Sequence, residues 1–212
     1  MVTASDPKGP WSDPIPLNKM GFDPSLFHDP DGTKWLVNML FDYRLDHKRF
    51  GGVGVQQYDP ETKKLVGPVY NVFKGSDKGT TEGPNIFYHD GWYYLVTAEG
   101  GTEFKHCVTM CRSEKLTGPY EISPYVPVLT SFGKDVQLKR AGHGQIIQGK
   151  DGSWYMAHLC SRSLGDCSIT GRATAIQNML YTDDGWFKLS ANDIASPEDF
   201  FEVPGEVEMC LI

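Results

Sequence analysis

Apolar and polar residues alternate along the chain in short stretches, and clusters of Gly, Pro, Asp and Asn separate these stretches. Alternation with a period of two is typical of β-strands that bury one face, and such clusters are typical of turns. No window of helical length has a sustained helical period, apart from a weak turn at Ser196–Phe201. The pattern therefore predicts an all-β fold.

Three segments of the chain share one plan: residues 23–38, 82–96 and 143–157. Each begins with an ionisable residue, reaches an Asp-Gly pair eight positions later and places an aromatic residue twelve positions later. The period is 59 residues (82 − 23) and then 61 residues (143 − 82). Strand-like stretches follow each segment, so one unit has about four strands in roughly 50–60 residues, which is typical of a β-propeller blade. A β-sandwich with chance internal similarity is the alternative.

The Asp-Gly pairs of the repeat, at residues 31–32, 90–91 and 151–152, lie between apolar stretches. Such a pair predicts a two-residue β-hairpin with a type I′ turn, in which both central residues take positive φ. A fourth pair, at residues 184–185, predicts one more hairpin.

The first residues of the three segments are Asp23, Glu82 and His143. In a propeller the first strand of each blade lines the central axis, so residues at the same blade position face one another. The repeat therefore predicts that these three side chains converge at one mouth.

Burial and a neighbouring carboxylate both raise the pKa of a carboxyl group. Two carboxyls with different pKa values are what the cleavage of a glycosidic bond needs.

Composition limits the partners of this chain. Its 212 residues are 40% hydrophobic and 12% aromatic, which is enough to bury a core. The formal net charge of −7 argues against a nucleic-acid partner and against an anionic membrane surface. No apolar run reaches the roughly 20 residues needed to cross a bilayer. Residues 1–10 lack the basic and apolar regions of a signal peptide, which slightly favours a cytoplasmic location without fixing the compartment.

Several short motifs occur in one order along the chain, up to about residue 187. They include Trp11-Ser12-Asp13-Pro14, Gly21-Phe22-Asp23-Pro24, Thr81-Glu82-Gly83-Pro84, Gly118-Pro119-Tyr120-Glu121, Ala141-Gly142-His143 and Gly171-Arg172-Ala173-Thr174. In these motifs the chain resembles glycoside hydrolase family 43, the β-xylosidases and α-L-arabinofuranosidases built on a five-bladed β-propeller. The resemblance implies a partial propeller of about three blades plus part of another in residues 1–187, with blade repeats starting near residues 23, 82 and 143. Residues 188–212 are expected to form a divergent C-terminal tail.

The resemblance also implies a role for individual residues. Glu82 is similar to the family's general acid, and Asp23 is similar to the carboxylate that raises the pKa of the acid and orients it. Arg172 is similar to the arginine that holds sugar hydroxyls. His143 is similar to the axial histidine, which contributes to the substrate site and helps hold a central cation, often calcium, or its water shell; the reaction itself requires no cofactor. Glu99 is a further candidate for lining the sugar site.

The expected activity is hydrolysis of xylo- or arabino-oligosaccharides by an inverting acid/base mechanism. The family's general base is an Asp on the first strand of the first blade, and the repeat arithmetic indicates that this blade is missing before Trp11. We therefore expect impaired activity, reduced stability and a tendency to form a homo-oligomer. The alternative is a non-catalytic carbohydrate-binding propeller fragment, and a third reading is a protein-interaction propeller that binds no sugar.

Overall fold

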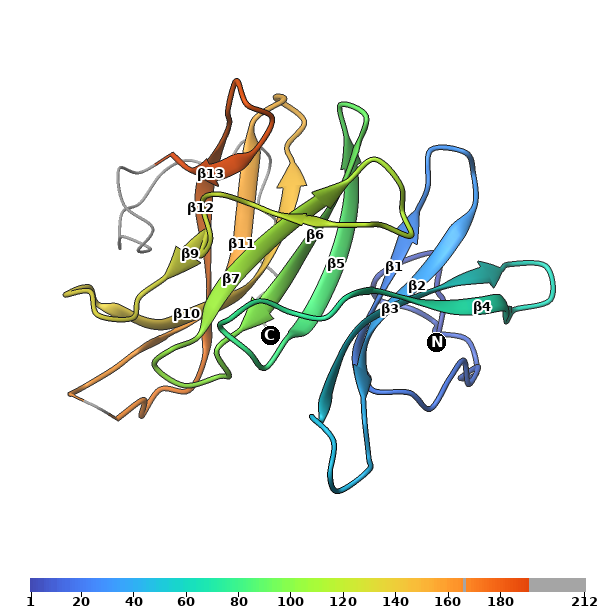
Figure 1. The fold of residues 1–212 in the computed structure, drawn as a ribbon, viewed down its shortest axis with the longest axis horizontal. Helices are drawn as coiled ribbons and strands as arrows, with labels where there is room; N and C mark the ends of the chain where they lie inside the picture. The colour runs from blue at the N-terminus through green and yellow to red at the C-terminus, as the bar shows by residue number, and fades with distance from the viewer. Residues whose placement is uncertain (166, 191–212) are drawn as a thin grey trace.

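Three antiparallel β-sheets follow one another along the chain in the computed structural model, which describes residues 1–165 and 167–190 (Figure 1). The first sheet has the order β1-β2-β3-β4, the second β5-β6-β7-β8 with β9 paired to β7, and the third β10-β11-β12-β13. The strands are β1 (Phe22–His28), β2 (Lys34–Phe41), β3 (Phe50–Asp59), β4 (Lys64–Phe73), β5 (Glu82–His89), β6 (Trp92–Glu99), β7 (Cys107–Ser113), β8 (Glu121–Ile122), β9 (Leu129–Thr130), β10 (Leu138–Gln148), β11 (Trp154–Arg162), β12 (Ala173–Tyr181) and β13 (Phe187–Leu189). Each sheet begins at one of the three sequence repeats.

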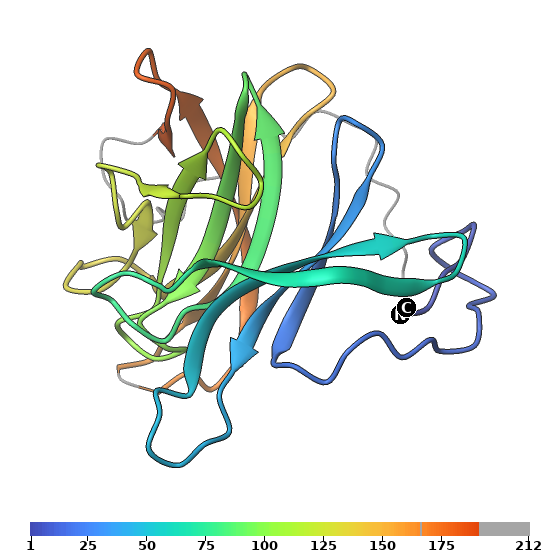
Figure 2. The ribbon, with the colours of Figure 1, turned by 45° about the vertical axis from the view of Figure 1, so that its right-hand side comes forward.

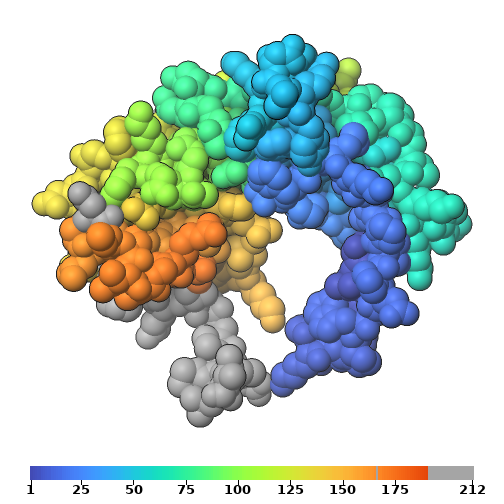
Figure 3. Space-filling view, turned by 90° about the horizontal axis from the view of Figure 1, so that it is seen from below, coloured from blue at the N-terminus to red at the C-terminus, as the bar shows by residue number. Residues whose placement is uncertain are grey.

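The first strands of the sheets lie next to one another. Strand β1 contacts β5, and β10 contacts both β5 and β6, so the sheets fan out from this side of the molecule (Figures 1 and 2). Seen from below, the sheets follow one another around a hollow (Figure 3). The all-β prediction is confirmed, and the three sheets are three blades of a propeller. Residues 1–21, which precede β1, form no strand.

One of the predicted type I′ turns is present. Asp90 and Gly91 join β5 to β6 with φ of 49° and 83°. The further hairpin predicted at 184–185 is confirmed, because β12 and β13 pair on either side of it. The prediction of a type I′ turn is wrong for the pairs at 31–32 and 151–152, where the glycine alone has positive φ. The carboxylates of Asp31 and Asp151 instead accept hydrogen bonds from the backbone N–H two residues later, at 2.8 Å and 3.1 Å. In these longer loops Asp acts as an Asx-turn acceptor, which needs no left-handed backbone at the Asp itself.

Two apolar cores separate the three sheets. The core between the first and second sheets includes Val37 and Val55 of one and Leu95 of the other, each with no exposed surface. The core between the second and third sheets includes Tyr94 and Phe187, which are fully buried and cross at a ring-centroid distance of 5.1 Å. Because each blade packs on the next, neighbouring blades stabilise one another through these cores.

The boundary expected at residue 187 falls within β13, which ends at Leu189. The remainder of the expected tail, including the turn at Ser196–Phe201, lies outside the described residues. Over the two described ranges, we find no helix with the length and apolarity of a membrane span.

Arg112 on β7 ties the second sheet to the third. Its guanidinium lies between the rings of Trp92 and Trp186, 4.2 Å and 4.1 Å from their centroids. The same group donates to Glu121 at 2.7 Å and to the carbonyl oxygens of Asp184 and Gly185 in the turn before β13. The planar fork of an arginine can stack and donate at the same time, which a lysine cannot do.

We expect Arg112→Ala to lower the free energy of unfolding by about 2–3 kcal/mol, because two cation–π contacts and the charge-assisted hydrogen bonds are lost together. Arg112→Lys keeps the charge and should recover less than half of this. Urea denaturation of the full chain measures both values. A loss below about 0.5 kcal/mol for the Ala variant, which is the level of an ordinary surface substitution, would show that the tie is unimportant.

Candidate active site

The first strand of every sheet has the same irregularity, at residues 22–25, 82–85 and 142–145. Gly83 is therefore the structural equivalent of Asp23 and His143, so the alignment predicted from the sequence is one residue out at Glu82. On β1 the register moves from Phe22↔Met39 to Ser25↔Val37, so three steps on β1 match two on β2. The equivalent shift occurs on β5 between Glu82 and Asn85, and on β10 between Gly142 and Gln145. Each is a β-bulge with one extra residue, a feature that bends a strand and redirects side chains next to active sites.

The backbone at these bulges is left-handed. Asp23 has φ of 51°, Gly83 has φ of 57° and His143 has φ of 53°. A positive φ is uncommon for residues other than glycine, and backbone strain of this kind is concentrated at functional sites. The strain at Asp23 and His143 identifies the bulges as the place where the fold departs from regular strands.

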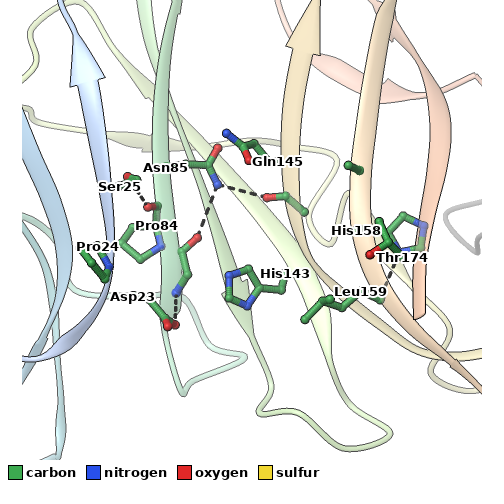
Figure 4. A pocket seen from close by; sticks show the side chains of 13 residues that line it. Asp23, Pro24, Ser25, Pro84, Asn85, His143, Gln145, His158, Leu159 and Thr174 are labelled. Atoms are coloured by element: carbon green, nitrogen blue, oxygen red, sulfur yellow. Dashed lines mark hydrogen bonds between the residues drawn. The ribbon is translucent and has the colours of Figure 1, made fainter. Parts of the chain in front are cut away.

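The bulges bring the three blades into direct contact (Figure 4). The backbone N–H of Gly83 donates to Asp23 Oδ2 at 3.0 Å. On the other side, a Cβ atom added at Gly83 would lie 2.6 Å from His143 Nε2, so the imidazole rests against the bare Cα of this glycine. Glu82 immediately precedes Gly83, so its backbone lies beside the contact that Asp23 and His143 make from the other two sheets. Asp23 and His143 line the cavity beside this contact, whereas Glu82 is not among its lining residues.

A cavity of about 430 Å³, here called the axial cavity, opens beside this contact (Figure 4). Residues from β1, β5, β10, β11 and β12 line it. Ser25 Oγ donates to the carbonyl oxygen of Pro84 at 2.8 Å, and Asn85 Nδ2 donates to that of Gly144 at 3.2 Å. These two hydrogen bonds cross from blade to blade and hold the cavity walls together.

Glu82 is half-buried at the start of β5 and has a distinctive electrostatic environment. Burial raises the pKa of the Glu82 carboxyl, and the Asp23 carboxylate raises it further. The Arg172 guanidinium works in the opposite direction and lowers the pKa. The net direction is upward, so this carboxyl keeps its proton to a higher pH than an ordinary glutamate and is suited to donate it.

Arg172 lies apart from the axial cavity. It is exposed and lines a second hollow of about 360 Å³, together with Thr102, Glu103 and Arg140. Its effect on the Glu82 pKa shows that its charge still reaches the acid. The Asp23 carboxylate beside the axial cavity and the Arg172 guanidinium beside the second hollow therefore act on the pKa of Glu82 in opposite directions.

Glu99 does not fit the sugar-lining role that the sequence suggested. Its side chain has no exposed surface, and the residues of the axial cavity do not include it. The hydroxyls of Ser76 and Thr81 and the backbone N–H of Ser76 donate to its carboxylate. A buried carboxylate that already accepts three hydrogen bonds has no face left for a sugar hydroxyl.

Calcium binding at His143 finds no support in the side chains of the described residues. No group of three or more His, Cys, Asp or Glu side chains among residues 1–165 and 167–190 is placed to hold a metal ion. Calcium takes six to eight oxygen ligands, whereas His143 offers a nitrogen that rests against Gly83. The residues present do not fit a protein-ligated calcium ion, and no step below depends on one.

Two buried imidazoles, His106 and His158, lie beneath the site and are not among the candidate residues that the sequence indicated. Burial lowers the pKa of both, so both are neutral at neutral pH. The His106 ring packs under Gly142, where an added Cβ would lie 2.5 Å from it, and His158 lines the axial cavity. Gly142 beside His143 was the one available signal, because a residue without a side chain permits such close approach.

The comparisons with known proteins show the family of this chain. The family profile described as "Glycosyl hydrolases family 43" matches residues 1–187. The chain belongs to glycosyl hydrolase family 43. Among solved structures, xylan β-1,4-xylosidase from Bacillus halodurans C-125 superposes with a TM-score of 0.91 at 48% identity, covering 98% of this chain and 41% of that one.

Two curated relatives of this family 43 chain carry names that state an activity. "Xylosidase/arabinosidase 43B" of Humicola insolens is 47% identical over 201 residues, covering 92% of this chain and 37% of the relative. "Xylan 1,3-beta-xylosidase" of a Vibrio species is 46% identical over 198 residues, covering 87% of this chain and 37% of the relative. The chain thus spans about 37% of the length of these relatives.

The contact between Gly83 and His143 predicts a large effect of Gly83→Ala. Gly79→Ala is the matched control, because Gly79 has φ of 71° and nothing lies within 4 Å of its added Cβ. The control should lower the free energy of unfolding by about 1–2 kcal/mol through backbone strain alone. Gly83→Ala should lower it by about 1–3 kcal/mol more, because the imidazole must move. Denaturation curves measure the difference, and equal losses would refute the close contact.

The charge of Asp23 predicts a lower Glu82 pKa in Asp23→Asn. Removing a neighbouring negative charge favours ionisation of the acid, so the titration midpoint should fall. Carboxyl ¹³C NMR of the labelled full chain, assigned with Glu82→Gln, measures this midpoint directly. Asp13→Asn, a change in the exposed N-terminal segment, is the control. An unchanged midpoint in Asp23→Asn would remove Asp23 from the role of tuning Glu82.

Proposed function

We propose that this chain provides the acid half of a glycosidase active site that acts on xylo- or arabino-oligosaccharides with inversion at the anomeric carbon. The observation that carries the proposal is Glu82, a half-buried carboxyl of a family 43 chain whose pKa is raised by burial and by the Asp23 carboxylate and lowered by the Arg172 guanidinium. Neutral acid, fixed carboxylate and cation are the groups that protonate a leaving oxygen and hold a sugar.

In the proposed reaction Glu82 donates its proton to the glycosidic oxygen as the bond from that oxygen to the anomeric carbon breaks. A water molecule attacks the anomeric carbon from the opposite face and loses a proton to a second carboxylate, the general base. The products are the leaving alcohol and a sugar of inverted configuration. Asp23 keeps Glu82 protonated, and Arg172 and His143 bind the sugar.

The general base is the second carboxylate that the proposed reaction needs. Acid and base of an inverting pair stand about 6.5–9.5 Å apart to leave room for water. Asp23 is the one carboxylate among the described residues that line the axial cavity, and Gly83 N–H occupies one of its oxygens. We propose that the base is not supplied by these residues, so the 212-residue chain turns over slowly.

The names of the relatives support the choice of substrate. A relative from Humicola insolens is named a xylosidase/arabinosidase, and one from a Vibrio species is named a xylan 1,3-β-xylosidase. Sugar binding without turnover is the second candidate function, favoured by the single carboxylate in the axial cavity.

Glu82→Gln tests the assignment of the acid. Aryl β-xylosides and aryl α-L-arabinofuranosides with poor leaving groups need protonation, so their turnover should fall by roughly 10²–10⁴. A 2,4-dinitrophenyl glycoside leaves without a proton and should be affected far less. Glu61→Gln, at an exposed turn, is the control. A uniform loss across leaving groups would contradict the role of Glu82 as acid.

Sodium azide separates the two candidate functions in the same assay. Azide attacks the anomeric carbon without losing a proton, so it needs no general base. If the chain is an enzyme lacking its base, azide should accelerate aryl release and yield the glycosyl azide of inverted configuration. Xylobiose binding by calorimetry with no azide effect would favour the non-catalytic function.

A further inference from the structure

The buried carboxylate of Glu99 organises a connection that leads into the acid. Glu99 ends β6, and the segment Lys74–Thr81 joins the first sheet to Glu82 at the start of the second. Thr81 Oγ1 donates to Glu99 Oε1 at 2.6 Å, and the Ser76 N–H donates to the same oxygen at 2.8 Å. The Ser76 hydroxyl donates to Oε2. One carboxylate therefore holds both ends of this segment.

The segment needs such an anchor because its backbone is strained. Thr80 has φ of 54°, which is uncommon for a β-branched residue, and Gly79 has φ of 71°. Gly83 is also left-handed, with φ of 57°, so unusual backbone lies on both sides of Glu82. Strained conformations persist only where surrounding contacts determine them. The contacts from Glu99 act on Thr81, between Thr80 and Glu82.

Packing around the carboxylate leaves little freedom. A Cβ added at Gly75 would lie 2.1 Å from Thr81 Oγ1 and 3.1 Å from Glu99 Oε1, so the backbone of Gly75 closes over this hydrogen bond. The N–H of Gly100 donates to the carbonyl oxygen of Gly79 at 2.8 Å. The segment is thereby fastened to the end of β6 at two separate points.

We propose that Glu99 is a positioning residue that, through Thr81, holds Glu82 in its half-buried place beside Asp23. This inference rests on the proposed function, which gives Glu82 its catalytic role. The hydrogen bond between Thr81 and Glu99 does not depend on that function. Glu82 is paired in the sheet with Ala98, the neighbour of Glu99. The pairing with Ala98 fixes the backbone of Glu82. The carboxylate of Glu99 fixes Thr81, the residue that precedes Glu82 in the chain.

The inference predicts what happens when the link is cut at Thr81. Thr81→Val keeps the shape of the side chain and removes the hydroxyl, whereas Thr81→Ser keeps the hydroxyl. In Thr81→Val the acid should become more hydrated, so its pKa should fall toward the ordinary glutamate value. Amide exchange at Gly83 should become several-fold faster. Thr81→Ser should restore both values.

Thr97→Val is the matched control for a purely structural loss. Thr97 is buried on β6, and its hydroxyl bonds that of Thr109 at 2.5 Å, so this change also removes one buried hydroxyl contact from the second sheet. It should lower the melting temperature as Thr81→Val does, but leave the Glu82 pKa and the Gly83 exchange rate unchanged. Ser76→Ala, which removes the second hydroxyl contact to Glu99, should repeat the effect of Thr81→Val.

Carboxyl ¹³C NMR and amide exchange on the full 212-residue chain provide these readouts without any turnover. An unmoved Glu82 pKa and Gly83 exchange rate in Thr81→Val and Ser76→Ala, or equal shifts in Thr97→Val, would overturn the positioning role. Failure of the proposed function would give a different result. Glu82→Gln would then leave the turnover of substrates with poor leaving groups unchanged, whether or not Thr81→Val changes the Glu82 pKa and the Gly83 exchange rate. Should Thr81→Val unfold, Ser76→Ala decides the question alone.

Discussion

The rest of this structure depends on how three first strands approach one axis. Each strand inserts one extra residue at the equivalent position of its sheet, and the left-handed backbone at Asp23, Gly83 and His143 follows from these bulges. Regular strands would keep their side chains alternating between the two faces of each sheet. The bulges instead allow the Gly83 N–H to reach the Asp23 carboxylate and the His143 ring to rest on the Gly83 Cα. A single missing side chain, at position 83, therefore permits the contact of three blades.

This arrangement has a cost for stability that follows from the pKa of Glu82. Because folding raises this pKa above its ordinary value of 4.5, the folded state binds the proton more tightly than the unfolded state does. The stability contributed by that proton is fully present below the ordinary pKa and is lost as pH rises through the folded pKa. At neutral pH the group is therefore a burden on folding, which is the trade-off typical of an active site.

Polar groups at the edges of the apolar cores offset this stability cost, because they hold neighbouring blades together. Arg112 links the second and third sheets through two tryptophans and a turn, and Glu99 fastens the connection between the first and second sheets. Both groups lie where one blade meets the next, and both satisfy their hydrogen-bonding capacity with several partners.

The sequence by itself determined the blades and their order, because the period-two alternation of strands and a repeat of about 60 residues can be read from the chain alone. It also indicated Asp23, Glu82 and His143 as equivalent positions, but the bulges show that Gly83 is the equivalent of Asp23 and His143. Only the tertiary structure decided what each side chain does there. Glu99 is the last residue of a strand that ends near the acid, which is a suitable place for a sugar ligand. It is buried instead, because Ser76 and Thr81, about 20 residues earlier, close over it. The hairpins at residues 31–32 and 151–152 differ from the predicted turns for a similar reason: loop length is set by the pairing of the strands, which no dipeptide encodes.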